Sequence, residues 1–137
     1  GAEPRSSLIV IVKPWHEQPE VVLANVHFYA SESQRLAQAT KLLERLAQEE
    51  RPVIIAGDFN STPNSKVLKL FADDWAFPDK GKDHLTFSSD NPRTEIDHIV
   101  FRPRDRFLVS KIDVIDEPVV SDHRPLMIDL VPAAENQ

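Results

Sequence analysis

Four short polar motifs contain the residue types that handle metal ions and phosphate groups. Each motif lies at the end of a short apolar run or beside one. The motifs are Asn25-Val26-His27, Gly57-Asp58-Phe59-Asn60, Ile96-Asp97-His98 and Ser121-Asp122-His123-Arg124-Pro125. Carboxylate oxygens bind hard cations such as Mg²⁺, and imidazole and amide groups stabilise or protonate phosphate oxygens. Gathered at one edge of a sheet, these motifs would form a site for a divalent cation and a phosphoester.

The Gly57-Asp58-Phe59-Asn60 motif directly follows the apolar run Val53–Ala56, which is typical of a central strand covered on both faces. Ligands of open α/β sheets bind beyond the carboxyl ends of strands. Asp58 and Asn60 are two residues apart and can point to the same side. We expect Asp58 to orient a water molecule or bind a metal ion, and Asn60 to donate to a phosphate oxygen. The alternative is an Asx-type turn without a function.

The motif from Ser121 to Pro125 precedes the last apolar run, and Pro125 restricts the residue before it. Asp122 is a candidate metal ligand, and His123 is a candidate proton donor or phosphate contact. Asp97 lies inside a strand-like run, where aspartate is disfavoured and needs a partner. His123 is its natural partner, since a carboxylate fixes the tautomer of a bonded imidazole. The alternative is an exposed polar turn.

The other histidines give weaker signals. His98 follows Asp97 and should point to the opposite face of the strand, where we interpret it as structural. His27 on its own is best interpreted as a core or rim histidine, and it gains a functional interpretation only together with Asp58 and His123. His16 and His84 are expected at the surface.

The composition excludes several classes of protein. The chain has 137 residues, a formal net charge of −6 and no cysteine. We therefore expect one domain from 1 to 137, without disulfides, zinc–cysteine sites or a cysteine nucleophile. The acidic charge argues against non-specific DNA binding and suits a cation-dependent site. No apolar run is long enough to span a membrane, the first residues do not resemble a signal peptide, and a soluble protein, cytoplasmic or exported, is expected.

Hydrophobic periodicity predicts an α/β arrangement with a mixed sheet. The apolar, β-branched run Ser7–Val12 predicts a buried strand. The other expected strands are Val21–Phe28, Val53–Ala56, Leu85–Phe87, Ile96–Phe101, Phe107–Ile115 and Leu126–Val131. Helices are expected over 31–50, between a capping box at Ser31 and Gln34 and the Arg51-Pro52 pair, and near Ser65–Phe71, both on one face of the sheet. The first two strands should form a hairpin around 15–20, the second and third a parallel pair, and the fourth and fifth another hairpin.

The four motifs, in this order, resemble those of the endonuclease/exonuclease/phosphatase superfamily, the DNase I-like hydrolases. The resemblance runs from about Leu8 to Leu130 and implies hydrolysis of a phosphoester with Mg²⁺ or Mn²⁺. It implies catalytic roles for five residues and a metal-binding role for Asp122, which Asp58 would share. The catalytic candidates are His27, Asp58, Asn60, Asp97 and His123. Asn60 and His27 are also implied to contact the substrate phosphate.

The family's fold is a layered β-sandwich flanked by helices, roughly twice as long as this chain. Its first half normally supplies an Asn and a Glu, the latter a principal metal ligand. Glu3 and Glu20 do not stand in that context. The resemblance therefore implies that this chain is the C-terminal half of the domain, with an incomplete site.

Several interpretations remain open at this stage. The chain can be part of a metal-dependent phosphoester hydrolase, or a non-catalytic binding or assembly module that retains the fold. An unrelated α/β binding domain is a third alternative. Substrates known in the family include DNA, RNA, inositol phosphates and sphingomyelin, and the motifs do not choose among them. We also expect the apolar sheet face to pack against a second copy or against a separate N-terminal half.

Overall fold

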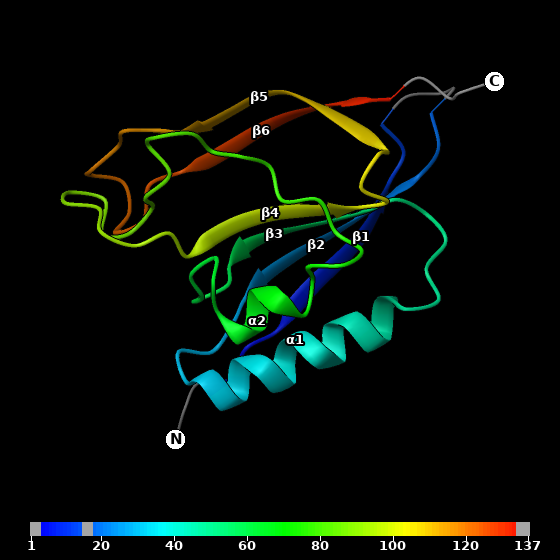
Figure 1. The fold of residues 1–137 in the computed structure, drawn as a ribbon, viewed down its shortest axis with the longest axis horizontal. Helices are drawn as coiled ribbons and strands as arrows, with labels where there is room; N and C mark the ends of the chain where they lie inside the picture. Colours follow the sequence, from blue (N-terminus) through cyan, green and yellow to red (C-terminus); the bar gives the residue numbers. More distant parts are fainter. Residues whose placement is uncertain (1–3, 15–17, 134–137) are drawn as a thin grey trace.

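The computed structural model describes residues 4–14 and 18–133, which form three layers (Figure 1). Two helices lie below a four-stranded sheet, and a two-stranded hairpin lies above it. The elements are β1 (Ser7–Val12), β2 (Val21–His27), α1 (Glu32–Leu46), β3 (Val53–Asp58), α2 (Lys66–Lys69), β4 (Asp97–Arg102), β5 (Phe107–Val114) and β6 (Leu126–Pro132). The predicted mixed sheet with both helices on one face is confirmed.

The four-stranded sheet has the order β1-β2-β3-β4. β1 and β2 form the expected antiparallel hairpin, and α1 connects β2 to the parallel strand β3. β4 then pairs with β3 in the antiparallel sense. The two inner strands are thus β2 and β3, and their carboxyl ends lie at the same end of the sheet.

The helix-covered face of the sheet contains the larger core. Alternate residues of β2, β3 and β4 point toward the helices because successive side chains of a strand point to opposite faces. They pack against apolar residues of α1, of α2 and of the segments around them. The fully buried members of this core include Val22, Val26, Phe28, Val53, Ile55, Phe59, Phe71 and Val100. Phe59 lies edge-on to Phe28 and Phe71, with ring centroids 5.0 and 5.7 Å away.

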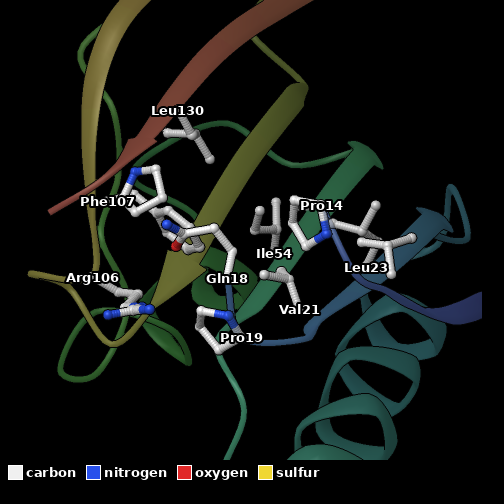
Figure 2. A pocket seen from close by; sticks show the side chains of 11 residues that line it. Pro14, Gln18, Pro19, Val21, Leu23, Ile54, Arg106, Phe107 and Leu130 are labelled. Atoms are coloured by element: carbon white, nitrogen blue, oxygen red, sulfur yellow. The ribbon is translucent and has the colours of Figure 1, made fainter. Parts of the chain in front are cut away.

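The opposite face is covered less completely by β5 and β6. Val21, Phe101 and Phe107 form a small buried cluster, to which Ile54 and Leu130 add partly buried side chains. A cavity of about 220 Å³ remains between the hairpin and the sheet. Figure 2 shows side chains from both layers converging on it, with Leu130 and Phe107 on one side and Ile54 and other sheet residues on the other.

Three segments differ from the local structure expected of them. β1 has the predicted bounds but is not buried, because it is an edge strand beyond the reach of the helices: Leu8 is 65% and Ile11 54% exposed. α1 ends at Leu46, not near Arg51-Pro52, and the side chain of its N-cap residue Ser31 makes no capping bond, so the predicted capping box is absent.

The third segment lies before β4. Phe87 forms isolated bridges with Thr94 and His123 and belongs to no strand, and the strand partner of β4 is β3. The expected hairpin of Leu85–Phe87 with Ile96–Phe101 is therefore replaced by a local loop. Residues 15–17 of the expected turn lie outside the described residues. No helix within 4–14 and 18–133 is long and apolar enough to cross a membrane.

Candidate active site

Three candidate residues lie in one row across the sheet, where β2 and β3 end and β4 begins (Figure 1). His27 of β2 is paired with Asp58 of β3, and Asp58 is paired with Asp97 of β4. Directly paired residues point to the same face of a sheet. The row therefore extends the face that β5 and β6 partly cover, and His27 Nε2 lies 3.3 Å from Asp58 Oδ2.

His123 reaches this row from the loop before β6. Its Nδ1 donates a hydrogen bond to Asp97 Oδ2 at 2.8 Å, as predicted from the sequence. Its Nε2 faces Asp58 Oδ2 at 3.9 Å. The ring of Phe87 packs against the imidazole with centroids 4.9 Å apart. The bond to Asp97 fixes the imidazole so that Nε2 is directed toward Asp58 and the open cleft.

The surroundings raise the pKa values of two residues in the site, His123 and Asp58. Burial alone would lower the pKa of His123, but the hydrogen bond to Asp97 and the charges of Asp97, Asp58 and Asp122 outweigh it and raise the pKa. Burial raises the pKa of Asp58, and the charge of Asp97 adds to this, against the backbone bond from Asn60 and the two histidines. Both pKa values are thus raised, and perturbed pKa values in a cleft are typical of functional sites.

The turn after β3 is shaped by two unusual backbone conformations. Gly57 has φ +140°, and a Cβ there would lie 2.0 Å from the carbonyl oxygen of Val26. Only glycine allows β2 and β3 to approach so closely at this point. Asn60 adopts the left-handed region, with φ 47°, which asparagine tolerates better than most residues. Between them, Asp58 points to the cleft and Phe59 to the core.

Asn60 is bonded within the turn. Its backbone N–H donates to Asp58 Oδ1 at 2.7 Å, which is the Asx-turn geometry considered as an alternative. Its side-chain amide donates to the carbonyl oxygen of Phe28 at 2.9 Å and to Asp58 Oδ2 at 3.3 Å. The two residues that form the Asx-type turn, Asp58 and Asn60, therefore also line the cleft. A contact of the Asn60 amide with phosphate would replace its longer bond, the one to Asp58 Oδ2.

Residues 86–89 support the site, although the sequence analysis assigned them no role there. The hydroxyl of Thr86, which is fully buried, accepts from the backbone N–H groups of Ile96 and Asp97, both at 3.3 Å. Ser89 donates through its hydroxyl to the carbonyl oxygen of Ser121 at 2.6 Å. The segment thus ties the start of β4 to the loop that carries His123. These contacts span many residues, and no local pattern indicates them.

The candidate residues surround an open cleft of about 510 Å³. Its lining residues are Arg5, His27, Ala30, Asp58, Asn60, Asp97, Ser121, Asp122 and His123. All six residues predicted from the motifs are among them. Arg5, which was not considered in the sequence analysis, is also present, and its guanidinium Nη1 donates to His27 Nδ1 at 3.0 Å.

The carboxylates in the cleft have the chemistry that a hard divalent cation requires, but they do not complete a binding site. Within the described residues, no group of three or more His, Cys, Asp and Glu side chains is arranged to hold a metal ion. Both oxygens of Asp58 accept from Asn60. Asp122 is exposed at the rim of the cleft. Mg²⁺ is commonly held by one or two carboxylates together with substrate oxygens and water, and these two side chains can supply that share.

His98 lies outside the site, as expected. It is 4% exposed on the helix-covered face, where its Nε2 donates to the carbonyl oxygen of Ser61 at 2.7 Å. Burial, together with the charge of Lys80, lowers the pKa of His98 to about 4. His84 contacts only the carbonyl oxygens of Gly81 and Lys82. His16 lies outside the described residues.

Fold and site together define a layered α/β protein with histidines and carboxylates at the end of its central strands. The model of the Endonuclease/Exonuclease/phosphatase family matches residues 5–123, and the chain belongs to this family. A UPF0294 protein of Yersinia pseudotuberculosis is 28% identical over 135 residues, which cover 92% of this chain and 48% of that protein. The chain thus spans about half the length of the curated relatives it matches first.

Solved structures confirm the expected DNase I-like fold. An endonuclease/exonuclease/phosphatase from Bacteroides vulgatus matches with a TM-score of 0.78 and 22% identity, over 93% of this chain and 56% of that one. The human Nocturnin catalytic domain with bound sulfate anion matches with a TM-score of 0.72 and 20% identity, over 94% and 53% of the two chains. At these identities the likeness concerns the fold, and again about half of each solved chain is matched.

Proposed function

We propose that this chain is the C-terminal part of a phosphoester hydrolase and carries most of its acid–base residues. The observation that carries the proposal is the row of His27, Asp58 and Asp97, with His123 bonded to Asp97 and facing Asp58. Membership of a family of nucleases and phosphatases supports the same reaction class. The sulfate bound to the Nocturnin domain supports an oxyanion ligand for this fold.

In this proposal, the side chains divide the proton transfers between them. Asp97 holds His123 with a proton on Nδ1, and the raised pKa keeps a larger share of His123 doubly protonated near neutral pH. His123 Nε2 can then donate a proton to a phosphate oxygen, which lowers the barrier to bond cleavage. Asp58, partly buried between the two histidines, orients the attacking water. His27 donates from Nε2 to an oxygen of the substrate.

We further propose that Mg²⁺ or Mn²⁺ is required, with Asp58 and Asp122 as the contribution of this chain. When bound, the cation would polarise the phosphoryl group and neutralise its charge. Because no group of three or more ligand side chains is arranged around a metal position within the described residues, the principal carboxylate is proposed to come from the remaining half of the domain. The isolated chain should accordingly bind the metal weakly and turn over little or no substrate.

The partly open face of the sheet is the proposed contact for that remaining half, or for a second copy of this chain. Two residues of the edge strand β1, Leu8 and Val10, are exposed and apolar on this face, where they pair with Asn25 and Leu23. A second cavity of about 390 Å³ opens beside the site. Exposed apolar surface of this kind marks an interface more often than free surface.

The test is hydrolysis by a longer protein that contains this chain and the remaining half of the domain. It should release phosphate or cleave a diester from a panel of nucleic acids, sugar phosphates, inositol phosphates and phospholipids, and chelation by EDTA should abolish this activity. Addition of Mg²⁺ or Mn²⁺ to the treated protein should restore it. The absence of hydrolysis on every substrate would favour the alternative of a non-catalytic binding module. Robust activity of the isolated chain would contradict the proposed share of the missing half.

A further inference from the structure

Arg5 is the only lysine or arginine among the described residues that line the cleft. The other charged groups there are the carboxylates of Asp58, Asp97 and Asp122. A cleft with this balance repels a phosphate group unless positive charge is supplied close to the reacting atoms. Arg5 carries a permanent charge at this place, since a guanidinium is not deprotonated in proteins.

The contact between Arg5 and His27 determines which nitrogen of His27 carries the proton. A guanidinium has donors and no acceptor, so Arg5 Nη1 donates to His27 Nδ1 across 3.0 Å. Nδ1 must then be the acceptor, and the proton of the neutral imidazole lies on Nε2. That nitrogen faces Asp58 Oδ2 at 3.3 Å, inside the cleft. Arg5 thereby makes His27 a donor toward the position of the substrate.

The backbone of Arg5 is also anchored. Its N–H donates to the hydroxyl of Tyr29 at 3.1 Å. The N–H of Tyr29 in turn donates to Gln38 Oε1 of α1 at 3.1 Å, and the side-chain amide of Gln38 lies 3.5 Å from the carbonyl oxygen of His27. The bonds around Tyr29 tie Arg5 and the end of β2 to the same helix. The guanidinium is therefore positioned relative to His27, and within residues 4–14 and 18–133 only its Nη1 donates a hydrogen bond.

We propose that Arg5 binds the substrate's phosphate group and holds His27 as its Nε2–H tautomer. This inference deepens the proposed function, on which it rests, by assigning the group that receives the anionic part of the substrate. A guanidinium matches two phosphate oxygens at once, which a lysine cannot do. Arg5 is thus a binding residue for the phosphate and a positioning residue for His27.

The tautomer is measured on the chain itself, labelled with ¹⁵N, in metal-free buffer at about pH 8, where imidazoles are neutral. Long-range ¹H–¹⁵N spectra distinguish the two ring nitrogens. Wild-type His27 should be the Nε2–H form, and Arg5→Ala should give a mixture of tautomers. Arg104→Ala is the matched control, because Arg104 is an exposed arginine that contacts the carbonyl oxygen of Asp73. It should leave the tautomer of His27 unchanged.

Phosphate binding is then followed on the same resonances by titration with inorganic phosphate. Arg5→Ala should raise the apparent Kd for phosphate at least about tenfold, because one charge-assisted hydrogen bond usually contributes that factor to affinity. Arg5→Lys should lie between Arg5→Ala and the wild type, and Arg104→Ala should match the wild type. Equal phosphate affinity in Arg5→Ala and the wild type, or no saturable binding to the wild type, would overturn the binding role.

The tautomer readout and the binding readout are independent of catalysis. An unchanged His27 tautomer in Arg5→Ala would overturn the positioning role. Neither measurement requires hydrolysis. Failure of the inference about Arg5 can therefore be distinguished from failure of the proposed hydrolase function. A longer protein that binds phosphate through Arg5 and cleaves no phosphoester would refute the proposed function alone. A longer protein that hydrolyses a phosphoester, but whose phosphate affinity is unchanged by Arg5→Ala, would refute the binding role of Arg5 alone.

Discussion

The two faces of the four-stranded sheet differ in how closely their side chains are packed. On the helix-covered face, Val22, Ile55 and Phe59 are at most 1% exposed, and aromatic rings pack edge to face around them. On the opposite face, the hairpin leaves a cavity of about 220 Å³, and the row of His27, Asp58 and Asp97 is open to solvent. The first face has the close packing of a finished core. The second has an apolar surface and a charged site, and it is packed less closely than the first.

This difference separates stability from function along single strands. Asp58 lies on the open face and its neighbour Phe59 in the closed core, and Asp97 and His98 divide in the same way. Because a strand alternates its side chains, these two motifs each place one residue in the site and the next residue in the core. The core therefore positions the site without contributing to its chemistry.

The largest expected effect on stability comes from a matched pair of neighbours on β3. Ile55→Ala removes a fully buried side chain from the closed core and should destabilise the chain by about 2–5 kcal/mol. Ile54→Ala acts on the open face, where the side chain is only partly buried beside the cavity, and should cost less than about half as much. Urea unfolding of both variants measures the difference. Equal losses would show that the two faces are equally well packed.

The second prediction concerns the electrostatics of the open face. Asp97→Asn keeps an acceptor for His123 Nδ1 but removes the charge that helps raise the pKa of His123. The titration midpoint of His123, whose pKa is raised in the wild type, should fall in this variant. The raised pKa stabilises the fold fully below the pKa of unfolded histidine, and this contribution disappears as pH rises through the folded pKa.

Titration of the His123 ring by NMR checks this prediction in both proteins. Asp129→Asn is the control, because Asp129 is an exposed carboxylate on β6 outside the lining of the cleft. It removes one negative charge elsewhere and should leave the midpoint of His123 unchanged. A midpoint that is the same in Asp97→Asn and the wild type would mean that the short contact does not control this histidine.

The smallest effect on stability is expected at the edge strand. Val10→Lys replaces a side chain that is 39% exposed and should change the free energy of unfolding by less than about 0.5 kcal/mol. It should nevertheless reduce self-association, since lysine on an edge strand opposes further pairing. Light scattering over a range of concentrations measures this, with Val119→Lys in an exposed loop as the control. A wild-type chain that stays monomeric throughout would contradict the pairing of two copies through this face and leave the remaining half of the domain as the proposed occupant.

The elements that the sequence predicts well are those with a strong local signal. Runs of β-branched residues placed β1, β2 and β3, and the strand–helix–strand order correctly predicted their hairpin and crossover. Asp97 was assigned its partner His123 because a carboxylate inside a strand requires one. In each case the physical cause acts within a few residues or through an unavoidable cost of burial.

Long-range contacts account for what the sequence did not reveal. β1 has the composition of a buried strand. It is exposed because it lies at the edge of the sheet, a position that depends on long-range strand pairing. Thr86 and Arg5 act on Asp97 and His27 across gaps of 11 and 22 residues, respectively, and neither belongs to a motif. The end of α1 was also mispredicted. The apolar spacing and the Arg51-Pro52 pair indicate a helix that continues to residue 50, whereas α1 ends at Leu46.

The central claim is that the row of His27, Asp58 and Asp97, together with His123, performs phosphoester hydrolysis. The most direct measurement is kcat of the longer protein carrying His123→Ala, beside His84→Ala as a control histidine outside the cleft. Loss of one acid–base group typically costs about 10²–10⁴ in rate, so His123→Ala should lose that much and His84→Ala almost nothing. Full activity of the His123→Ala protein would contradict the account.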